Sequence, residues 1–166
     1  IAEESGLSDP LWQGFDRIFQ GDGELGTRLF YVYSELLKKH NPVFLIGADS
    51  PQITPAHLLQ AHLFYEEPQK NTFVIGGTED GGFYLFGGNG FIAKEIWTRV
   101  PYSQLNTAAT LRNLLMHFGR IEELPELFDI DTAEDLKKLC HEFNGGLDWL
   151  REQKEVVAWA SQLAKS

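Results

Sequence analysis

Residues 43–51 read Val43-Phe44-Leu45-Ile46-Gly47-Ala48-Asp49-Ser50-Pro51 and are the most informative run of the chain. A short apolar run bounded by turn residues is typical of a strand buried on both faces of an α/β sheet. We therefore expect residues 43–47 to form the central strand of a sheet. Ligands of open α/β sheets collect beyond the carboxyl ends of strands, so Asp49 is placed to hold a hard cation such as Mg²⁺. The alternative, that Asp49 only supports the turn before Pro51, stays open on this signal alone.

The segments on either side alternate between strand and helix patterns, with Gly and Pro as boundaries, and this rhythm predicts an α/β fold. The clearest helix start is Thr54-Pro55, an N-cap followed by proline at the first helical position. The expected strands are residues 17–20, 43–47, 72–76, 83–86 and 120–124. The expected helices are residues 27–40, 54–63, 106–118, 131–143 and 147–165, with residues 144–146 ending the fourth.

Composition narrows the classes of function. The 166 residues are 43% hydrophobic, which is enough for one buried core, and the formal net charge is -10. This charge argues against a nucleic-acid partner, because phosphate backbones are bound mainly by clustered Lys and Arg. An anionic ligand would need a bridging cation. Membrane helices need roughly 20 apolar residues, and no such run occurs, so no membrane span is expected. The single Cys140 excludes an internal disulfide and fits a cytoplasmic location.

The acidic turn Glu79-Asp80-Gly81-Gly82 is a second candidate site. Paired glycines let the backbone approach a ligand closely, and a neighbouring carboxylate can act as a base or orient a hydroxyl. The alternative is an ordinary turn between two strands.

The stretch Asp129-Ile130-Asp131 is a third candidate. Alternation in an extended segment puts both carboxylates on the same side, where they could share a metal ion. Helix capping is the competing explanation for Asp131, because Asp131 or Thr132 begins a helix with Glu134 in its first turn.

The loop at residues 20–28 combines three glycines with Arg28. Its backbone could pass close to a base or ribose, and the guanidinium could meet a phosphate. The loop lacks the Gly-Lys-Ser/Thr ending of a Walker loop.

Taken in order, four motifs resemble those of the bacterial DUF2064 family of glycosyltransferase-like proteins, which is related to phospholactate guanylyltransferase. They are residues 21–28, 46–51, 79–85 and 129–136, and the resemblance covers residues 20–143. It implies a Rossmann-like three-layer sandwich of the GT-A nucleotide-diphospho-sugar transferase type over residues 1–143. The family's usual N-terminal strand, basic glycine-containing loop and helix have no counterpart in this sequence.

The resemblance also implies roles for individual residues. Asp49 matches the family's metal-binding Asp, Asp131 is a second acidic contact to a Mg²⁺ or Mn²⁺ ion, and residues 80–84 match the acceptor-side glycine turn. We expect Asp80 to be catalytic. The expected contacts to a nucleotide or nucleotide-sugar are Gly26, Arg28, Gly81, Gly82 and Tyr84. Three functions stay open: glycosyl transfer from a sugar nucleotide, nucleotidyl transfer to a phosphorylated acceptor, and a non-catalytic binding module that keeps the fold.

Residues 144–166 are expected to add a C-terminal helix that packs on the domain or takes part in association. Trp149 and Trp159 are ten positions apart, which is about 280° around an ideal helix, so one stripe cannot bury both. A homodimer is one consequence. The alternative is that Trp159 folds back on the same domain.

Overall fold

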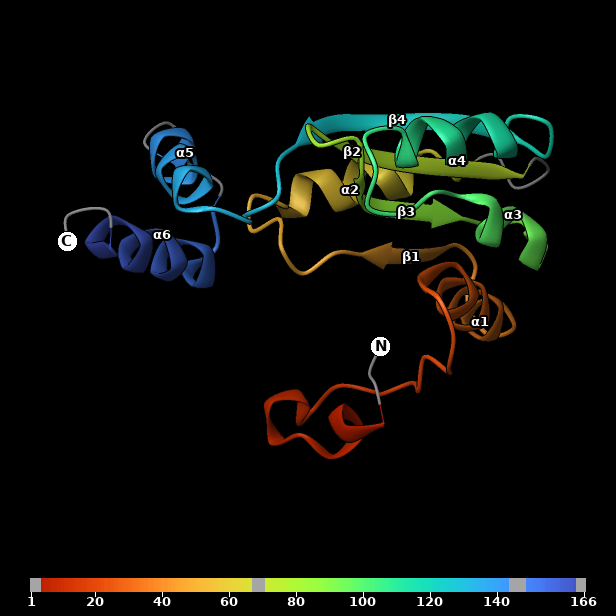
Figure 1. The fold of residues 1–166 in the computed structure, drawn as a ribbon, viewed down its shortest axis with the longest axis horizontal. Coiled ribbons are helices and arrows are strands. Elements are labelled where there is room, and N and C mark those ends of the chain that lie inside the picture. The colour runs from red at the N-terminus through yellow and green to blue at the C-terminus, as the bar shows by residue number, and fades with distance from the viewer. Residues whose placement is uncertain (1–3, 67–70, 144–148, 164–166) are drawn as a thin grey trace.

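The computed structural model describes residues 4–66, 71–143 and 149–163, in which a four-stranded sheet lies between helices and a helix pair packs at one end (Figure 1). The strands are β1 (Val43–Ile46), β2 (Thr72–Thr78), β3 (Phe83–Gly88) and β4 (Arg120–Leu127). The helices are α1 (Leu25–Leu37), α2 (Pro55–Leu63), α3 (Lys94–Arg99), α4 (Thr107–Leu115), α5 (Ala133–Phe143) and α6 (Arg151–Leu163). Two short 3₁₀ turns, Ser5–Ser8 and Pro10–Trp12, precede α1.

The strand order is β1-β3-β2-β4, and β3 runs antiparallel to both of its neighbours. Since β2 and β4 are parallel, the strands β1, β2 and β4 all run in the same direction. Their carboxyl ends therefore lie together at one end of the sheet, which is the end at which α/β proteins bind ligands.

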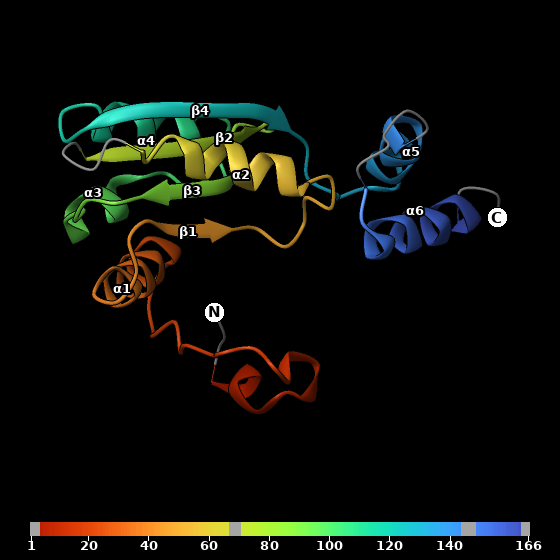
Figure 2. The same ribbon diagram turned by 180° about the vertical axis from the view of Figure 1, so that it is seen from behind.

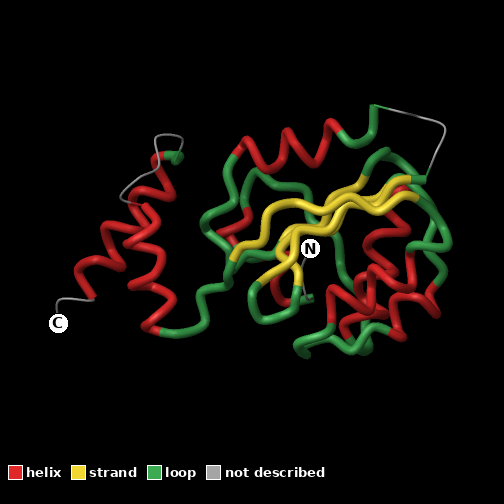
Figure 3. The backbone as a smooth tube through the Cα atoms, turned by 90° about the horizontal axis from the view of Figure 1, so that it is seen from above, coloured by secondary structure: helices red, strands yellow, loops and turns green. Residues whose placement is uncertain are grey.

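Helices cover both faces of the sheet. Helix α2 lies on one face (Figure 2), and α1, α3 and α4 lie on the other, as the view from above also shows (Figure 3). Successive side chains of β2 point to opposite faces, which explains this arrangement. Phe73 and Ile75 belong to the core cluster that contains Trp97 of α3, and Val74 belongs to the cluster that contains Ala61 of α2. The predicted three-layer α/β sandwich is confirmed.

The position predicted for residues 43–47 is wrong, because β1 is an edge strand among the described residues. The antiparallel β3 lies between β1 and β2, and Ile46 is 47% exposed. A continuous apolar run shows that a strand contacts protein on its two faces, but it carries no information about the order of its neighbours.

Three further details differ from the sequence prediction. Residues 17–20 do not form a strand, and only Phe19 makes an isolated bridge. Helix α3 was not predicted, because its six residues are too few to display a helical period. Strands β2, β3 and β4 extend beyond the predicted ends, and Leu124 is the one buried residue of β4, so the later residues of that strand lack an apolar pattern.

Helices α5 and α6 form a hairpin at the end of the sheet where the parallel strands finish (Figure 1). Phe128, Leu139 and Val157 make its buried core. Trp149 precedes α6 and makes an edge-to-face contact with Phe143, with ring centroids 5.0 Å apart, whereas Trp159 is 55% exposed. The helical-wheel argument about the two tryptophans was therefore wrong about Trp149, although one tryptophan does remain outside the core. The predicted helix ends at residues 147–148 and 164–165 lie outside the described residues, as do residues 144–146.

Candidate functional site

Three carboxylates converge beyond the carboxyl ends of the parallel strands. Asp49 follows β1, Asp80 follows β2 and Asp129 follows β4, and all three line one cavity of about 320 Å³. We call this cavity the acidic pocket. Its lining also includes apolar side chains from helix α1 and an aromatic ring from the loop after α3, namely Leu25, Leu29 and Tyr102.

The segments that carry Asp49 and Asp129 are joined by three hydrogen bonds. The hydroxyl of the buried Ser50 donates to Asp129 Oδ1 at 2.6 Å, and the Asp49 carbonyl accepts from the Ile130 N–H at 3.0 Å. Gln52, also buried, donates from Nε2 to the Phe128 carbonyl at 2.8 Å. These bonds hold the two acidic segments side by side, so the carboxylates are positioned before any ligand binds.

Helix α6 supports the same loop from its other side. Gln153 donates from Nε2 to the carbonyl oxygens of Pro51 and Ile53 at 2.7 and 2.8 Å, and its Oε1 accepts from the Leu150 N–H. One buried amide thus accepts from the N–H of the residue before α6 and ties the helix hairpin to the loop that follows Asp49.

The charge of Asp80 is stabilised within its own turn. Its Oδ1 accepts from the Thr78 hydroxyl and from the Gly82 N–H. The Thr78 bond, followed by the Gly82 bond, lowers the pKa of Asp80 below its ordinary value. Asp80 is therefore an anion at neutral pH whether or not a cation is bound.

Asp129 has the opposite electrostatic environment. Partial burial raises its pKa, and the neighbouring charges of Asp49 and Asp80 add to the effect. The hydrogen bond from Ser50 opposes this rise without cancelling it. The three carboxylates together would thus be stabilised by a bound cation.

The donor set fits Mg²⁺ or Mn²⁺ held jointly by protein and substrate. Among the described residues, no three His, Cys, Asp or Glu side chains are arranged to hold a metal ion by themselves. Mg²⁺ commonly takes only one or two carboxylates, together with waters and substrate phosphates. Asp49 and Asp129 can supply such a pair, and the rest of the shell would come from a diphosphate and water.

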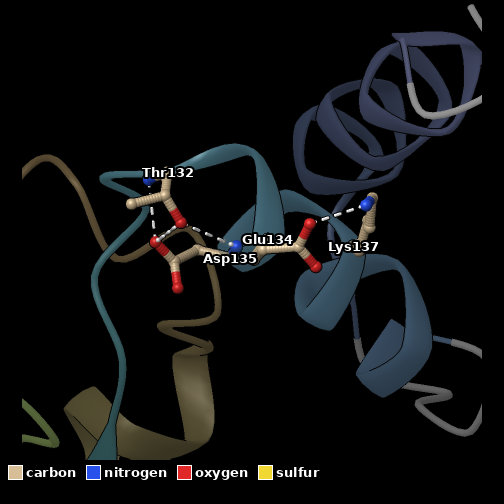
Figure 4. A network of polar contacts seen from close by, with 4 residues as sticks. All are labelled: Thr132, Glu134, Asp135 and Lys137. Atoms are coloured by element: carbon tan, nitrogen blue, oxygen red, sulfur yellow. Dashed lines mark hydrogen bonds and ion pairs between the residues drawn. The ribbon is translucent and has the colours of Figure 1, made fainter.

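Asp131 lies beside the acidic pocket and is not the helix cap. Figure 4 shows that Thr132 caps α5: Thr132 Oγ1 accepts from the Asp135 N–H, and Asp135 Oδ2 accepts from the Thr132 N–H at 2.8 Å. Glu134 instead pairs with Lys137 at 2.7 Å. Capping therefore does not explain Asp131, whose side chain lines a second pocket together with Asp80.

The glycines of the acidic turn bring it against the loop at residues 101–106. Gly81 has a φ of +87°, and a Cβ there would lie 2.0 Å from the Leu105 carbonyl oxygen. Its own carbonyl accepts from the Ala108 N–H at 2.9 Å. Gly82 lines the acidic pocket, and a Cβ there would crowd the Thr78 hydroxyl at 2.9 Å. The turn thus needs glycine for close packing between two protein segments.

Of the remaining predicted contacts, Tyr84 lines the acidic pocket, whereas Gly26 and Arg28 are not among its lining residues. The Tyr84 hydroxyl donates to the Pro125 carbonyl at 3.0 Å, and burial raises the pKa of Tyr84 to about 12. Gly26 packs on α3, where a Cβ would lie 2.5 Å from the Trp97 carbonyl oxygen. Arg28, in the first turns of α1, donates from Nε to the Gly23 carbonyl at 2.7 Å.

Sequence reasoning did not assign Asp129, Thr78 or Ser103 to the site. Asp129 was considered as a metal ligand with Asp131, and the structure is what places it beside Asp49 and Asp80. Ser103 lines both pockets with a left-handed φ of 58°, a conformation for which a serine carries no sequence signal. Thr78 reads as an ordinary strand residue.

Comparison with solved structures identifies the fold class. The chain matches a crystal structure of a protein from Desulfovibrio desulfuricans G20, provisionally described as a nucleotide-diphospho-sugar transferase, with a TM-score of 0.67 and 22% identity. The match covers 90% of this chain and 69% of the other. The chain therefore has a GT-A-like α/β fold. No protein in the curated set matches it.

The family is established by sequence. A family model described as an uncharacterized protein conserved in bacteria, DUF2064, matches residues 2–104, which is more than half of the chain. The chain belongs to the DUF2064 family. Within the described residues, every helix is too short or too polar to cross a membrane.

Proposed function

We propose that this protein is a metal-dependent transferase that uses a nucleotide-activated substrate, with glycosyl transfer from a nucleotide-diphospho-sugar as the reaction. One observation carries the proposal. Asp49, Asp80 and Asp129 follow three parallel strands and line a single pocket at their carboxyl ends, where α/β proteins bind ligands. The GT-A-like fold of the chain supports it.

Asp49 and Asp129 would hold Mg²⁺ or Mn²⁺, and Asp131 would make a second acidic contact to the ion through water. The bound ion would offset the negative charge of the diphosphate as it leaves. The protein's own task is to hold the two carboxylates at a set spacing, which the bonds from Ser50, Gln52 and Gln153 achieve.

Asp80 would orient the acceptor hydroxyl and take up its proton. Both of its internal hydrogen bonds go to Oδ1, so Oδ2 is the atom that would meet the hydroxyl. In the transfer step, the acceptor oxygen bonds to the sugar C1, and the bond from C1 to the diphosphate oxygen breaks. The diphosphate keeps the bonding electron pair, and the acceptor proton moves to Asp80 Oδ2.

The nucleotide would lie against helix α1. Leu25, Leu29 and Tyr102 give the acidic pocket an apolar wall suited to a base or ribose, and Arg28 in the same helix would contact a phosphate. Gly26 lets the first turn of α1 pack closely on α3, and Gly81 lets the acidic turn pack on Leu105, so both glycines support the elements that carry this site. We place the reaction in the cytoplasm, where the free Cys140 stays reduced.

Self-association is a separate proposal that rests on α6. Val156, Trp159 and Leu163 are 38%, 55% and 49% exposed and lie within one narrow arc of the helix. Pairing of this stripe with a second copy would cover it. Sedimentation of the wild type and Trp159→Glu tests the idea, and a wild type that stays monomeric at high concentration would refute it.

Calorimetric titration of UDP and GDP, with and without Mn²⁺, tests the transferase proposal. We expect one nucleotide to bind only with the metal, and Asp49→Asn to weaken that binding at least tenfold. Binding that is equal in the wild type and Asp49→Asn would reject the metal role of Asp49. Metal-dependent binding followed by no hydrolysis or transfer of any nucleotide-sugar would instead favour a binding module. Transfer of a nucleotidyl group to a phosphorylated acceptor would identify the other candidate reaction.

A further inference from the structure

A second pocket adjoins the acidic pocket across Asp80 and is referred to here as the outer pocket. It is lined by Asp80, Ser103, Gln104, Leu105, Asn106 and Asp131. Asp80 and Ser103 belong to both pockets. A molecule in the outer pocket would therefore lie next to Asp80 and beside whatever occupies the acidic pocket.

The wall of the outer pocket is built before any ligand arrives. Thr107 Oγ1 lies 2.7 Å from the carbonyl oxygens of both Pro101 and Gln104, and it accepts from the Gln104 N–H at 3.2 Å. The contact between Gly81 and Leu105 joins this loop to the acidic turn. Gln104 and Asn106 are thus carried on a fixed backbone that lines the pocket.

The chemistry of the outer pocket disfavours a phosphate group. Its lining, as far as the structure describes it, contains no Lys, Arg or His, and it holds the carboxylates of Asp80 and Asp131. Two amides at the start of helix α4 are already engaged and do not compensate. The N–H groups of Thr107 and Ala108 already donate to the carbonyls of Gln104 and Gly81 at 3.0 and 2.9 Å. A phosphate dianion here would meet repulsion from two carboxylates, with no cationic side chain in the described lining to offset it.

The same lining suits hydroxyl groups. Serine, glutamine and asparagine side chains both donate and accept hydrogen bonds, and carboxylates accept them, so a polyol can pair with every polar side chain of the pocket. We propose that the outer pocket binds an uncharged, hydroxyl-rich acceptor, such as a sugar or polyol, and selects against phosphorylated acceptors. This inference rests on the proposed transferase function and adds the substrate class of its acceptor side.

Saturation-transfer NMR with matched ligand pairs tests the selection. The probes are glucose against glucose 6-phosphate and glycerol against glycerol 3-phosphate, each with and without Mg²⁺ and UDP or GDP. We expect the neutral member of at least one pair to give a signal at least threefold stronger than its phosphorylated partner. Gln104→Arg places a cation in the pocket and should reduce or reverse that preference. Gln60→Arg, the same change at an exposed position on α2, should leave it unchanged.

A wild type that prefers the phosphorylated members, or that binds none of the four, would overturn the inference. A preference that Gln104→Arg and Gln60→Arg leave equally unchanged would also overturn it, because the ligand would then lie elsewhere. The nucleotide titrations on the same samples separate this result from the proposed function. If the wild type prefers the neutral sugar but binds no nucleotide in the presence of metal, the proposed transferase function is rejected and the neutral ligand class of the outer pocket is retained. If metal-dependent nucleotide binding is observed but the phosphorylated ligands bind better than the neutral ones, the neutral ligand class is rejected and the transferase proposal stands.

Discussion

Two segments place carboxylates in the same pocket, the turn at residues 78–82 and the segment at residues 128–131. The first stabilises the charged form of its carboxylate, and the second destabilises it. In the turn, Thr78 and Gly82 donate hydrogen bonds to Asp80 and lower its pKa. In the second segment, burial and two neighbouring anions raise the pKa of Asp129. The two carboxylates therefore suit different roles. Hydrogen bonds within the turn stabilise the charged form of Asp80 without a ligand, whereas the charged form of Asp129 would be stabilised by a bound cation.

The largest expected effect comes from breaking the turn itself. Gly81→Ala places a Cβ in a left-handed conformation and against the Leu105 backbone. We expect a loss of about 3 kcal/mol or more of unfolding free energy, measured by urea denaturation. Gly77→Ala is the matched control, because a Cβ there would lie 4.0 Å from its nearest neighbour, and its loss should stay below about 1 kcal/mol. Equal losses in the two variants would show that the contact between turn and loop is not specific.

Asp129→Asn tests the other side of the comparison. We expect metal-dependent nucleotide affinity to fall at least tenfold, because the cation loses a carboxylate. The metal-free variant should nevertheless melt slightly higher at pH 7, by about 1–2 °C, since Asp129 stays partly solvated and the penalty for its charge is modest.

The pH dependence of this difference follows from the raised pKa of Asp129. The wild type carries the penalty where Asp129 is charged, above its folded-state pKa, and loses it as Asp129 becomes protonated on acidification. The difference in Tm between the variant and the wild type should therefore shrink as the pH falls. A variant that melts lower than the wild type at pH 7 would contradict this account of Asp129.

Asp131→Asn should have a smaller effect, of about two- to fivefold, on metal-dependent nucleotide affinity, because we assign Asp131 an indirect contact. Its Tm should stay unchanged, since Thr132 and Asp135 cap α5. Thr132→Ala is the control for the cap and should cost about 1 kcal/mol of stability without changing nucleotide affinity. If affinity is unaltered in Asp131→Asn, the acidic contact to the metal does not exist.

The smallest effect is expected for Thr78→Val, which keeps the shape of a buried side chain and removes its hydroxyl. The pKa of Asp80 should rise, and carboxyl titration by NMR measures it directly. Because the lowered pKa stabilises the folded state only where Asp80 is charged, the wild type should lose its advantage over the variant as the pH falls through the Asp80 pKa. An unshifted Asp80 pKa would show that Gly82 alone stabilises the charge.

Local features were predictable from the amino-acid sequence wherever a few neighbouring residues decide the outcome. Thr54 and Pro55 begin α2, and the apolar runs at residues 72–76 and 83–86 mark β2 and β3. The position of Asp49 after a strand and of Asp80 in a glycine turn also followed from short motifs. Each of these depends on backbone preferences or on the period of burial along one segment, which are properties of adjacent residues.

Tertiary structure alone decided which segments meet. The edge position of β1 depends on the insertion of β3 between β1 and β2, and no local pattern encodes that order. Asp129 joins Asp49 because Ser50 reaches a carboxylate 79 positions away in the chain. Side chains such as Gln153 and Ser103 look ordinary in sequence and acquire their roles only from the backbone that packs around them. The sequence alone determined most of the elements and the carboxylates that follow the strands, because short-range forces set both. The pairing of strands, and hence the shared pocket, required contacts between residues far apart in the chain.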